Sequence, residues 1–248
     1  MALMEATDRT RFEVAAVSLY PKSGTILERE IQEKGLKVYF LNKHRGLDLR
    51  IIPQLCHLFR NLHPEVIHTH RYVLRYALLP MLLYHIPVRV HTVHSVAQKE
   101  VDLFGKIVHC IAFRIGGVLP VSISHEVART VRAVYGQDIR TPVIYNGIPT
   151  ARFISFKAMK DTVVDRKDLI LLHVSRFAPP KNHHLLVEAF AMAVKECPTM
   201  ELWLVGDGPL RPMVEKLVDE KRLEKKVVFL GIRDDVPELL AKADVFVL

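Results

Sequence analysis

Short runs of aliphatic and β-branched residues alternate with helical runs along almost the whole chain, and this alternation restricts the possible folds. Runs typical of strands occupy residues 12–19, 36–41, 65–70, 88–94, 117–121, 142–145, 168–175, 200–205, 227–230 and 244–248. Runs typical of helices lie between them, at 25–34, 49–62, 72–85, 101–114, 124–135, 182–196, 210–221 and 235–241. Strands that alternate with helices predict parallel sheets joined by right-handed crossovers.

The polar stretch at residues 151–167 interrupts this rhythm and is the expected domain boundary. We therefore predict an α/β protein with two Rossmann-like, doubly wound parallel-sheet domains, at residues 1–150 and 168–248, joined by a linker at 151–167. Both domains are expected to be incomplete. The chain opens with a few polar residues before its first strand-like run, and it ends on the apolar run 244–248 without a turn.

Composition excludes several classes of protein. Half of the 248 residues are hydrophobic, so a packed core is expected rather than disorder. The three cysteines have no spacing typical of disulfides or metal ligands, which indicates reduced thiols and a cytoplasmic protein. The first 13 residues do not resemble a secretory signal. The longest apolar run, residues 76–88, is interrupted by prolines and falls short of the roughly 20 residues of a membrane-spanning helix.

Positive charge is concentrated in the first half of the chain. Residues 1–145 contain 19 Lys and Arg against 12 Asp and Glu, which accounts for +7 of the formal net charge of +8. An excess of this kind favours an anionic partner, such as a phosphorylated acceptor or the inner face of a membrane, although solvated surface charge is an equally good interpretation. Nucleic acid is the least favoured partner, because no nucleic-acid-binding motif is present.

The loop that follows the run at 168–175 has features of a diphosphate site. Ligands bind open parallel sheets at the carboxyl ends of the strands. Here Arg176 and Lys181 flank a turn stiffened by Pro179 and Pro180, and Asn182 is a plausible N-cap of the next helix. Two cations beside free backbone N–H groups can hold a diphosphate. The alternative is a proline-rich surface turn with two solvated charges.

Two later strand-to-helix connections contain glycine. Gly206 and Gly208 allow the backbone to approach a ligand closely, and Gly231, Ile232 and Arg233 repeat the arrangement. Either connection can equally be an ordinary turn without a ligand.

Four histidines gather at strand ends in the first half of the chain: His68, His70, His91 and His94. Imidazole can hydrogen-bond a phosphate or a reacting hydroxyl at neutral pH. The chain contains 13 histidines, so each of the four is more often structural than catalytic on pattern alone. His94 is the best placed, because it ends its strand and precedes Ser95.

Several segments together resemble one enzyme family: HTVHS (91–95), VIYNGI (143–148), HVSRFAPPKNHHLLVEAF (173–190), LWLVGDGPLR (202–211) and VVFLGIRDDVPELLAKADVFVL (227–248). In order and spacing they are similar to family 4 of the glycosyltransferases, which are retaining enzymes with the glycosyltransferase-B fold. The resemblance implies transfer of a sugar from a nucleoside-diphosphate sugar to a hydroxyl of a carbohydrate or lipid-linked acceptor, as in cell-envelope or polysaccharide biosynthesis.

The resemblance also implies roles for individual residues. Arg176 and Lys181 match the basic pair that holds the donor diphosphate and stabilises the leaving nucleotide, without a metal or other cofactor. His94 matches a histidine that faces the reacting centre on the acceptor side. Gly206 and the backbone at Ile232 and Arg233 match positions that line the nucleotide pocket, and Gly208 is grouped with these nucleotide-binding positions.

The chain departs from the family pattern in three places. The glycine-rich loop after the family's first strand has no counterpart, since residues 12–19 resemble the second strand. The family's two-glutamate segment would begin after Leu248, and Asn182 stands where many relatives have glycine. Two alternatives therefore remain open: a nucleotide-sugar epimerase of the same fold, and a catalytically inactive fragment that binds nucleotide.

Overall fold

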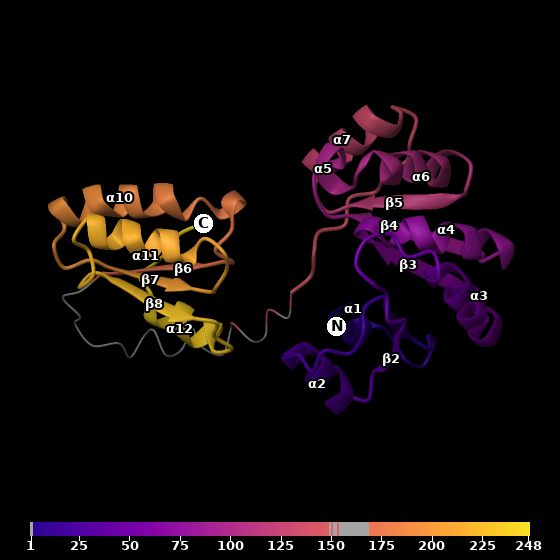
Figure 1. Ribbon diagram of the computed structural model, residues 1–248, viewed down its shortest axis with the longest axis horizontal. Helices are drawn as coiled ribbons and strands as arrows, with labels where there is room; N and C mark the ends of the chain where they lie inside the picture. Colours follow the sequence, from indigo (N-terminus) through magenta and orange to yellow (C-terminus); the bar gives the residue numbers. More distant parts are fainter. Residues whose placement is uncertain (1, 149, 151–152, 154–168) are drawn as a thin grey trace. The chain divides into compact units, whose positions relative to one another are not determined.

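A computed structural model of the chain describes residues 2–148, 150, 153 and 169–248 (Figure 1). It divides into two compact units, Met1–Ile148 and Pro149–Leu248. Apart from Phe153, the linker expected at residues 151–167 lies outside the described residues.

The first unit contains five parallel strands and the helices that connect them. In chain order its elements are α1 (Ala2–Ala6), β1 (Ala15–Ser18), α2 (Ile26–Glu33), β2 (Lys37–Phe40), α3 (Ile51–Leu62), β3 (Val66–His70), the short 3-10 helix η1 (Arg71–Val73), α4 (Leu74–Leu83), β4 (Val88–Val93), α5 (Ala97–Glu100), α6 (Leu103–Arg114), β5 (Val118–Ser122) and α7 (His125–Tyr135). The strands form two sheets, β1-β2 and β3-β4-β5. The predicted α/β architecture with parallel sheets is confirmed.

Side-chain caps fix where three helices of this unit begin. The Thr25 hydroxyl accepts a hydrogen bond from the backbone N–H of Glu28 at the start of α2. Asp102 caps α6 through the N–H of Gly105, and Ser124 caps α7 through the N–H of Val127. Each cap satisfies a backbone donor that the first helical turn leaves unpaired.

Helices α3, α4 and α6 lie side by side, and α4 contacts both of its neighbours. Their inner faces supply Ile51, Leu74 and Met81 to one continuous core, and none of these three side chains is exposed to solvent. The core continues into the sheet through Val93 and Val118. The outer faces of α4 and α6 differ from the rest of this unit, because almost all of their exposed side chains are apolar.

Three short elements differ from the sequence prediction. Residues 142–145 form no strand, and only Val143 makes a bridge, to Ser122. Pro142 cannot donate a backbone hydrogen bond, and Ile144 and Tyr145 are exposed, so nothing extends the pairing. Helices α1 and α5 were not predicted, because a helix of four or five residues is too short to show a period. Tertiary contacts stabilise them instead: Met4 and Ala97 are buried.

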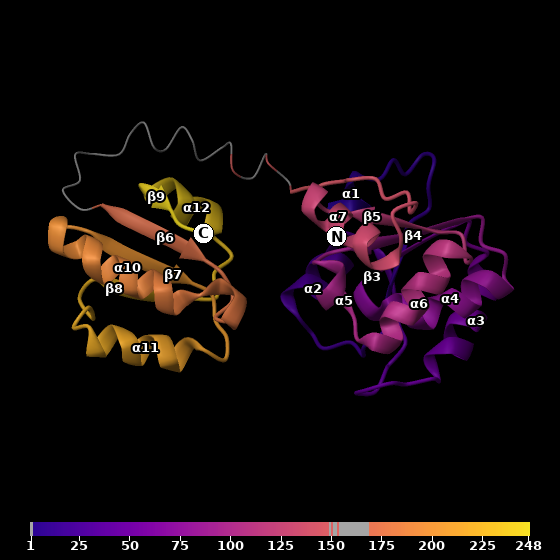
Figure 2. The same cartoon turned by 90° about the horizontal axis from the view of Figure 1, so that it is seen from above.

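The second unit is a four-stranded parallel sheet of strand order β8-β7-β6-β9 (Figure 2). Its elements are β6 (Ile170–Val174), the 3-10 helix η2 (Pro179–Lys181), α10 (His183–Glu196), β7 (Glu201–Val205), α11 (Arg211–Glu220), β8 (Val227–Gly231), α12 (Val236–Lys242) and β9 (Val245–Phe246).

Helices cover both faces of this sheet. Leu202 and Leu204 of β7 pack against α10 and α11, whereas Leu172 of β6 and Val205 of β7 pack against Leu239 of α12. A sheet buried on both faces needs apolar side chains on both sides of each strand, which explains the continuous apolar runs in the sequence.

The loops after β6 and β7 approach each other so closely that only glycine fits in the second loop. The backbone N–H of Ser175 donates to the carbonyl of Val205 at 2.9 Å, and that of Phe177 donates to the carbonyl of Asp207 at 3.0 Å. A Cβ atom on Gly206 would lie 2.0 Å from the Ser175 carbonyl oxygen, and one on Gly208 would lie 2.5 Å from that of Phe177. Both glycines have positive φ angles, 125° and 156°.

This close approach predicts that Gly206→Ala destabilises the second unit. The added Cβ collides with backbone and the φ angle is strained, so the free energy of unfolding should fall by at least about 2 kcal/mol. Gly231→Ala is the matched control, because Gly231 also has a positive φ but its Cβ would meet only the end of Arg211, at 4.0 Å. Its expected loss is about 1 kcal/mol. Fluorescence of Trp203, the single tryptophan, reports unfolding of this unit; equal losses would contradict the role given to backbone contact.

Candidate active site

Arg176 and Lys181 lie on the loop that leads from the carboxyl end of β6 to α10. Buried Phe177 anchors this loop beneath them, and Pro179 and Pro180 form the η2 turn. Both cationic side chains are exposed, and neither has a hydrogen bond or ion pair with any residue that the structure describes. Their positive charges are therefore accessible to an external anion.

Asn182 stands at the N-cap position of α10 but does not cap the helix with its side chain. It has a left-handed conformation, with φ 46° and ψ 45°, and its amide makes no capping hydrogen bond. The N-cap interaction expected at Asn182 is therefore absent. Glycine and asparagine tolerate this left-handed conformation better than other residues.

A chain of hydrogen bonds beneath the loop connects β9, β6 and α10. His173 Nδ1 lies 2.9 Å from the Val247 carbonyl oxygen, and His173 Nε2 lies 2.7 Å from Ser175 Oγ. Ser175 Oγ lies 3.2 Å from His183 Nε2, and the His183 ring stacks on Phe177 with 4.1 Å between centroids. No local sequence pattern indicates this network, because it depends on contacts between residues up to 74 positions apart.

The directions of these hydrogen bonds follow from the carbonyl, which can only accept. His173 Nδ1 must donate to it. In the neutral tautomer of His173, Nε2 then accepts from the Ser175 hydroxyl, whose oxygen accepts in turn from His183 Nε2. His183 Nδ1 is then an acceptor, and it has no partner among the described residues. Burial, and after it the charges of His173 and Lys181, lower the pKa of His183 to about 4. At neutral pH His183 is therefore uncharged, and the network holds the Arg176 loop to the sheet.

The other positions predicted to bind nucleotide lie at the same edge of this sheet, because β6, β7 and β8 are neighbouring parallel strands. Gly206 and Gly208 follow β7, and the close contacts that the structure shows at both are to backbone. Ile232 follows β8 and is 78% exposed. The Arg233 guanidinium is already paired with both carboxylate oxygens of Asp235, so it is less available to an anion than Arg176.

Three of the four candidate histidines of the first unit gather at the carboxyl ends of β3 and β4. His70 Nδ1 lies 2.9 Å from His94 Nε2, and His68 Nε2 lies 2.7 Å from the Thr92 hydroxyl. The backbone N–H of His94 donates to Glu100 Oε1 at 3.2 Å. The strand register His70↔Thr92 places these residues side by side. His94 is therefore one member of a cluster.

His91 belongs to the core and not to this cluster. It is fully buried, its Nδ1 lies 2.8 Å from the Thr69 hydroxyl, and its ring makes an edge contact with that of His109. Burial, followed by the charge of His109, holds its pKa well below the ordinary value of histidine. His91 is a neutral packing residue. Side chains alternate between the two faces of a strand, so His91 faces the core whereas His94, three residues later, does not.

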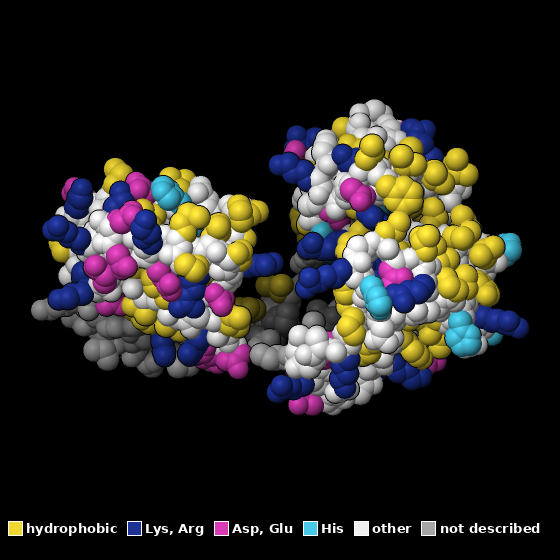
Figure 3. Space-filling model, in the orientation of Figure 1, with side chains coloured by type: hydrophobic (Ala, Val, Ile, Leu, Met, Phe, Trp, Pro, Cys, Tyr) yellow, Lys and Arg dark blue, Asp and Glu magenta, His cyan; other side chains and the backbone are white. Residues whose placement is uncertain are grey.

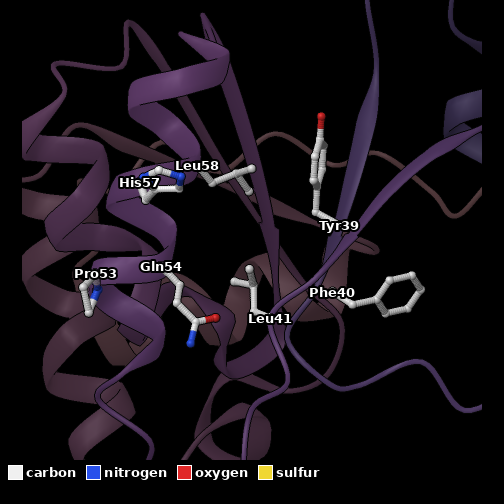
Figure 4. A pocket seen from close by; sticks show the side chains of 7 residues that line it. All are labelled: Tyr39, Phe40, Leu41, Pro53, Gln54, His57 and Leu58. Carbon is white, nitrogen blue, oxygen red and sulfur yellow. The ribbon is translucent and has the colours of Figure 1, made fainter.

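A pocket of about 440 Å³ lies elsewhere in the first unit, between β2 and α3 (Figure 4). Tyr39, Phe40 and Leu41 line one side, and Pro53, Gln54, His57 and Leu58 line the other. No lysine or arginine and none of the candidate residues lines it, so its chemistry does not suit a diphosphate. Size alone does not make it the active site.

Within residues 2–148 and 169–248, no group of three or more His, Cys, Asp or Glu side chains is arranged to hold a metal ion. None of the helices in the described part of the chain combines the length and the apolar character that crossing a bilayer requires.

Comparison with protein families gives a direct result. Residues 1–152 match the family described as Glycosyltransferase Family 4, and residues 155–248 match the family described as Glycosyl transferases group 1. The chain belongs to glycosyltransferase family 4. The resemblance noted in the sequence motifs is thereby confirmed.

Among curated proteins, this family 4 chain is 26% identical over 220 residues to the N-acetyl-α-D-glucosaminyl L-malate synthase of Bacillus anthracis, and the match covers 85% of this chain and 57% of that protein. It is also 26% identical, over 217 residues, to an Escherichia coli UDP-Gal:α-D-GlcNAc-diphosphoundecaprenol α-1,3-galactosyltransferase, covering 81% of this chain and 56% of that one. The chain thus spans about half the length of these relatives.

Solved structures confirm the fold. HepE of Anabaena, crystallised with UDP and glucose, superposes with a TM-score of 0.74 at 20% identity, over 94% of this chain and 65% of HepE. WaaG, a glycosyltransferase of lipopolysaccharide biosynthesis, superposes with a TM-score of 0.56 at 16% identity, over 94% of this chain and 74% of WaaG. The fold is therefore glycosyltransferase-B, as the motifs implied, while the roles of individual residues stay predictions.

The histidine cluster yields a test of its electrostatics. Burial, then the charges of His68 and His94, lower the pKa of His70 to about 4. His94→Gln removes one of these charges, so the pKa of His70 should rise, as measured by NMR titration of the imidazole. His57→Gln on α3 is the control and should leave it unchanged.

The lowered pKa of His70 also determines how the stability of the fold depends on pH. His70 binds protons more weakly in the folded than in the unfolded chain, so its contribution destabilises the fold as pH falls from about 6.5 toward 4. A His70 pKa that does not move in His94→Gln would contradict the pairing.

Proposed function

We propose that this chain forms the donor-binding and acceptor-side parts of a glycosyltransferase. In this proposal the enzyme transfers a sugar from a nucleoside-diphosphate sugar to an acceptor hydroxyl, with retention of the anomeric configuration. The observation that carries it is the pair Arg176 and Lys181, two exposed cations without a partner among the described residues, beside the first turn of α10. Family membership and the names of the relatives support the reaction class.

The chemistry requires cations at the point where negative charge develops. When the bond between the anomeric carbon and the diphosphate oxygen breaks, the departing nucleotide gains charge. Preorganised cations and the backbone N–H groups at a helix start stabilise that charge more than they stabilise the intact donor, which lowers the barrier. The proposal assigns this role to Arg176, Lys181 and the start of α10, and it needs no metal or other cofactor.

The acceptor side of the proposal rests on the first unit. His94, hydrogen-bonded to His70, is proposed to face the acceptor hydroxyl. The acceptor is proposed to be a carbohydrate or a lipid-linked sugar, since one relative's name specifies a diphosphoundecaprenol-linked sugar. An acceptor of that class lies at a membrane, and the basic first unit suits peripheral contact with an anionic leaflet.

The donor-site proposal predicts selective loss of nucleotide binding. Charge-assisted contacts are worth roughly 1.5–3 kcal/mol each, so Arg176→Ala and Lys181→Ala should each weaken UDP or GDP binding by about tenfold or more in calorimetry. Lys216→Ala is the matched control: Lys216 is an exposed cation of the same unit, but it already pairs with Glu220.

Affinities for both nucleotides that are unchanged in Arg176→Ala and in Lys181→Ala would remove the donor-site assignment. Loss in the Lys216→Ala variant as well would indicate general charge attraction instead of a site. Transfer from a panel of radiolabelled nucleotide sugars would then identify the sugar.

A further inference from the structure

The outer faces of α4 and α6 are almost entirely apolar. The exposed residues of α4 are Leu79, Leu82 and Leu83, and all three are leucine. Of the five exposed residues of α6, four are apolar and the fifth is an arginine: Leu103, Phe104, Ile107, Ile111 and Arg114. Ile115, directly after α6, is 83% exposed. We call these residues, without Arg114, the α4–α6 face.

The face is continuous. Helices α4 and α6 contact each other, and Leu78 of α4 lies close to the backbone at the end of α6. Figure 3 shows the same result, with apolar side chains gathered over this part of the first unit. Single exposed apolar residues are ordinary on a protein surface, but a contiguous group on two neighbouring helices marks an interaction surface.

All the charged side chains within α4 and α6 are positive. Neither α4 nor α6 contains an aspartate or glutamate, whereas together they contain Arg75, Lys106 and Arg114. Arg75 pairs with Asp102 and Arg114 with Asp138, both beyond the helix ends, while Lys106 has no partner among the described residues.

Two other surface helices, α7 and α11, expose mostly polar side chains, in contrast to this face. Helix α7 of the same unit exposes His125, Glu126, Arg129 and Ala133, and α11 of the second unit exposes Lys216, Asp219 and Glu220 among its outward residues. Those helices have the polar outer stripe expected toward water. The α4–α6 face lacks it.

We propose that the α4–α6 face is the surface by which the first unit binds an anionic phospholipid bilayer. Leu, Ile and Phe side chains enter the boundary between headgroups and acyl chains, and Lys106 with the +7 excess of residues 1–145 attracts the anionic headgroups. This proposal names the surface for the membrane contact proposed above, and it does not depend on sugar transfer.

Charge argues for lipid over a second copy of the chain. In a symmetric dimer through this face, α4 and α6 would meet the same two helices, which offer no carboxylate to Lys106. An anionic leaflet supplies both an apolar layer and the opposite charge. The experiment below distinguishes binding of lipid from binding of a second copy.

The test measures co-sedimentation with vesicles of phosphatidylcholine alone and with added phosphatidylglycerol. The chain should bind the phosphatidylglycerol vesicles more tightly, and rising salt should reduce the difference because exposed charges are screened. Ile107→Asp combined with Ile111→Asp should weaken binding by at least about tenfold. The matched control is Met192→Asp combined with Met213→Asp, two exposed apolar residues on α10 and α11, which should bind as the unmodified chain does.

A second measurement does not require aspartate substitutions, which could destabilise the fold. Phe104→Trp places a reporter on the face, while Trp203 in the second unit serves as the internal reference. Phosphatidylglycerol vesicles should shift the emission of the Phe104→Trp variant to shorter wavelength and leave that of the unmodified chain unchanged. UDP binding by the Asp variants should be normal, which separates this surface from the donor site.

The proposal is overturned if the chain binds neither kind of vesicle, or if the substitutions at Ile107 and Ile111 leave binding unchanged. An emission of Phe104→Trp that does not respond to vesicles would also overturn it. So would light scattering that shows a dimer dissociated by Ile107→Asp and Ile111→Asp, because the face would then belong to a second copy.

Discussion

The second unit depends on the contact between the loop after β6 and the loop after β7. Two backbone hydrogen bonds join them, and Gly206 and Gly208 permit an approach that any side chain would block. The buried hydrogen-bond chain through His173, Ser175 and His183 fixes the first loop from below. Because Arg176 stands on a loop held in this way, the backbone that carries it is ordered without a ligand, as its proposed role in binding a diphosphate requires.

This arrangement gives the two glycines a role different from the one the motif alone suggests. A glycine after a strand is commonly interpreted as room for a ligand. Here the close contacts are with the backbone of Ser175 and Phe177, so the glycines hold together the loop that carries the cations. The two roles are compatible, since a nucleotide can lie above a loop pair that is packed beneath it.

The sequence was sufficient to predict the alternation of strands and helices and the placement of Arg176 and Lys181 at a strand end. These features depend on local pattern and on the geometry of parallel sheets. It was insufficient for α1, whose stability depends on burial of Met4, and for the cap expected at Asn182, where the backbone is left-handed. The separation of His91 from His94 follows from strand alternation, because residues three positions apart on a strand face opposite sides of the sheet.

The central claim is that Arg176 and Lys181 recognise the diphosphate of the donor, and comparing two ligands tests it most directly. Calorimetry should give tighter binding for UDP than for uridine to the unmodified chain, since only UDP carries the phosphates. In a chain with both Arg176→Ala and Lys181→Ala, that difference should largely disappear while uridine binding is retained. A UDP preference of the same size in both chains would contradict the claim.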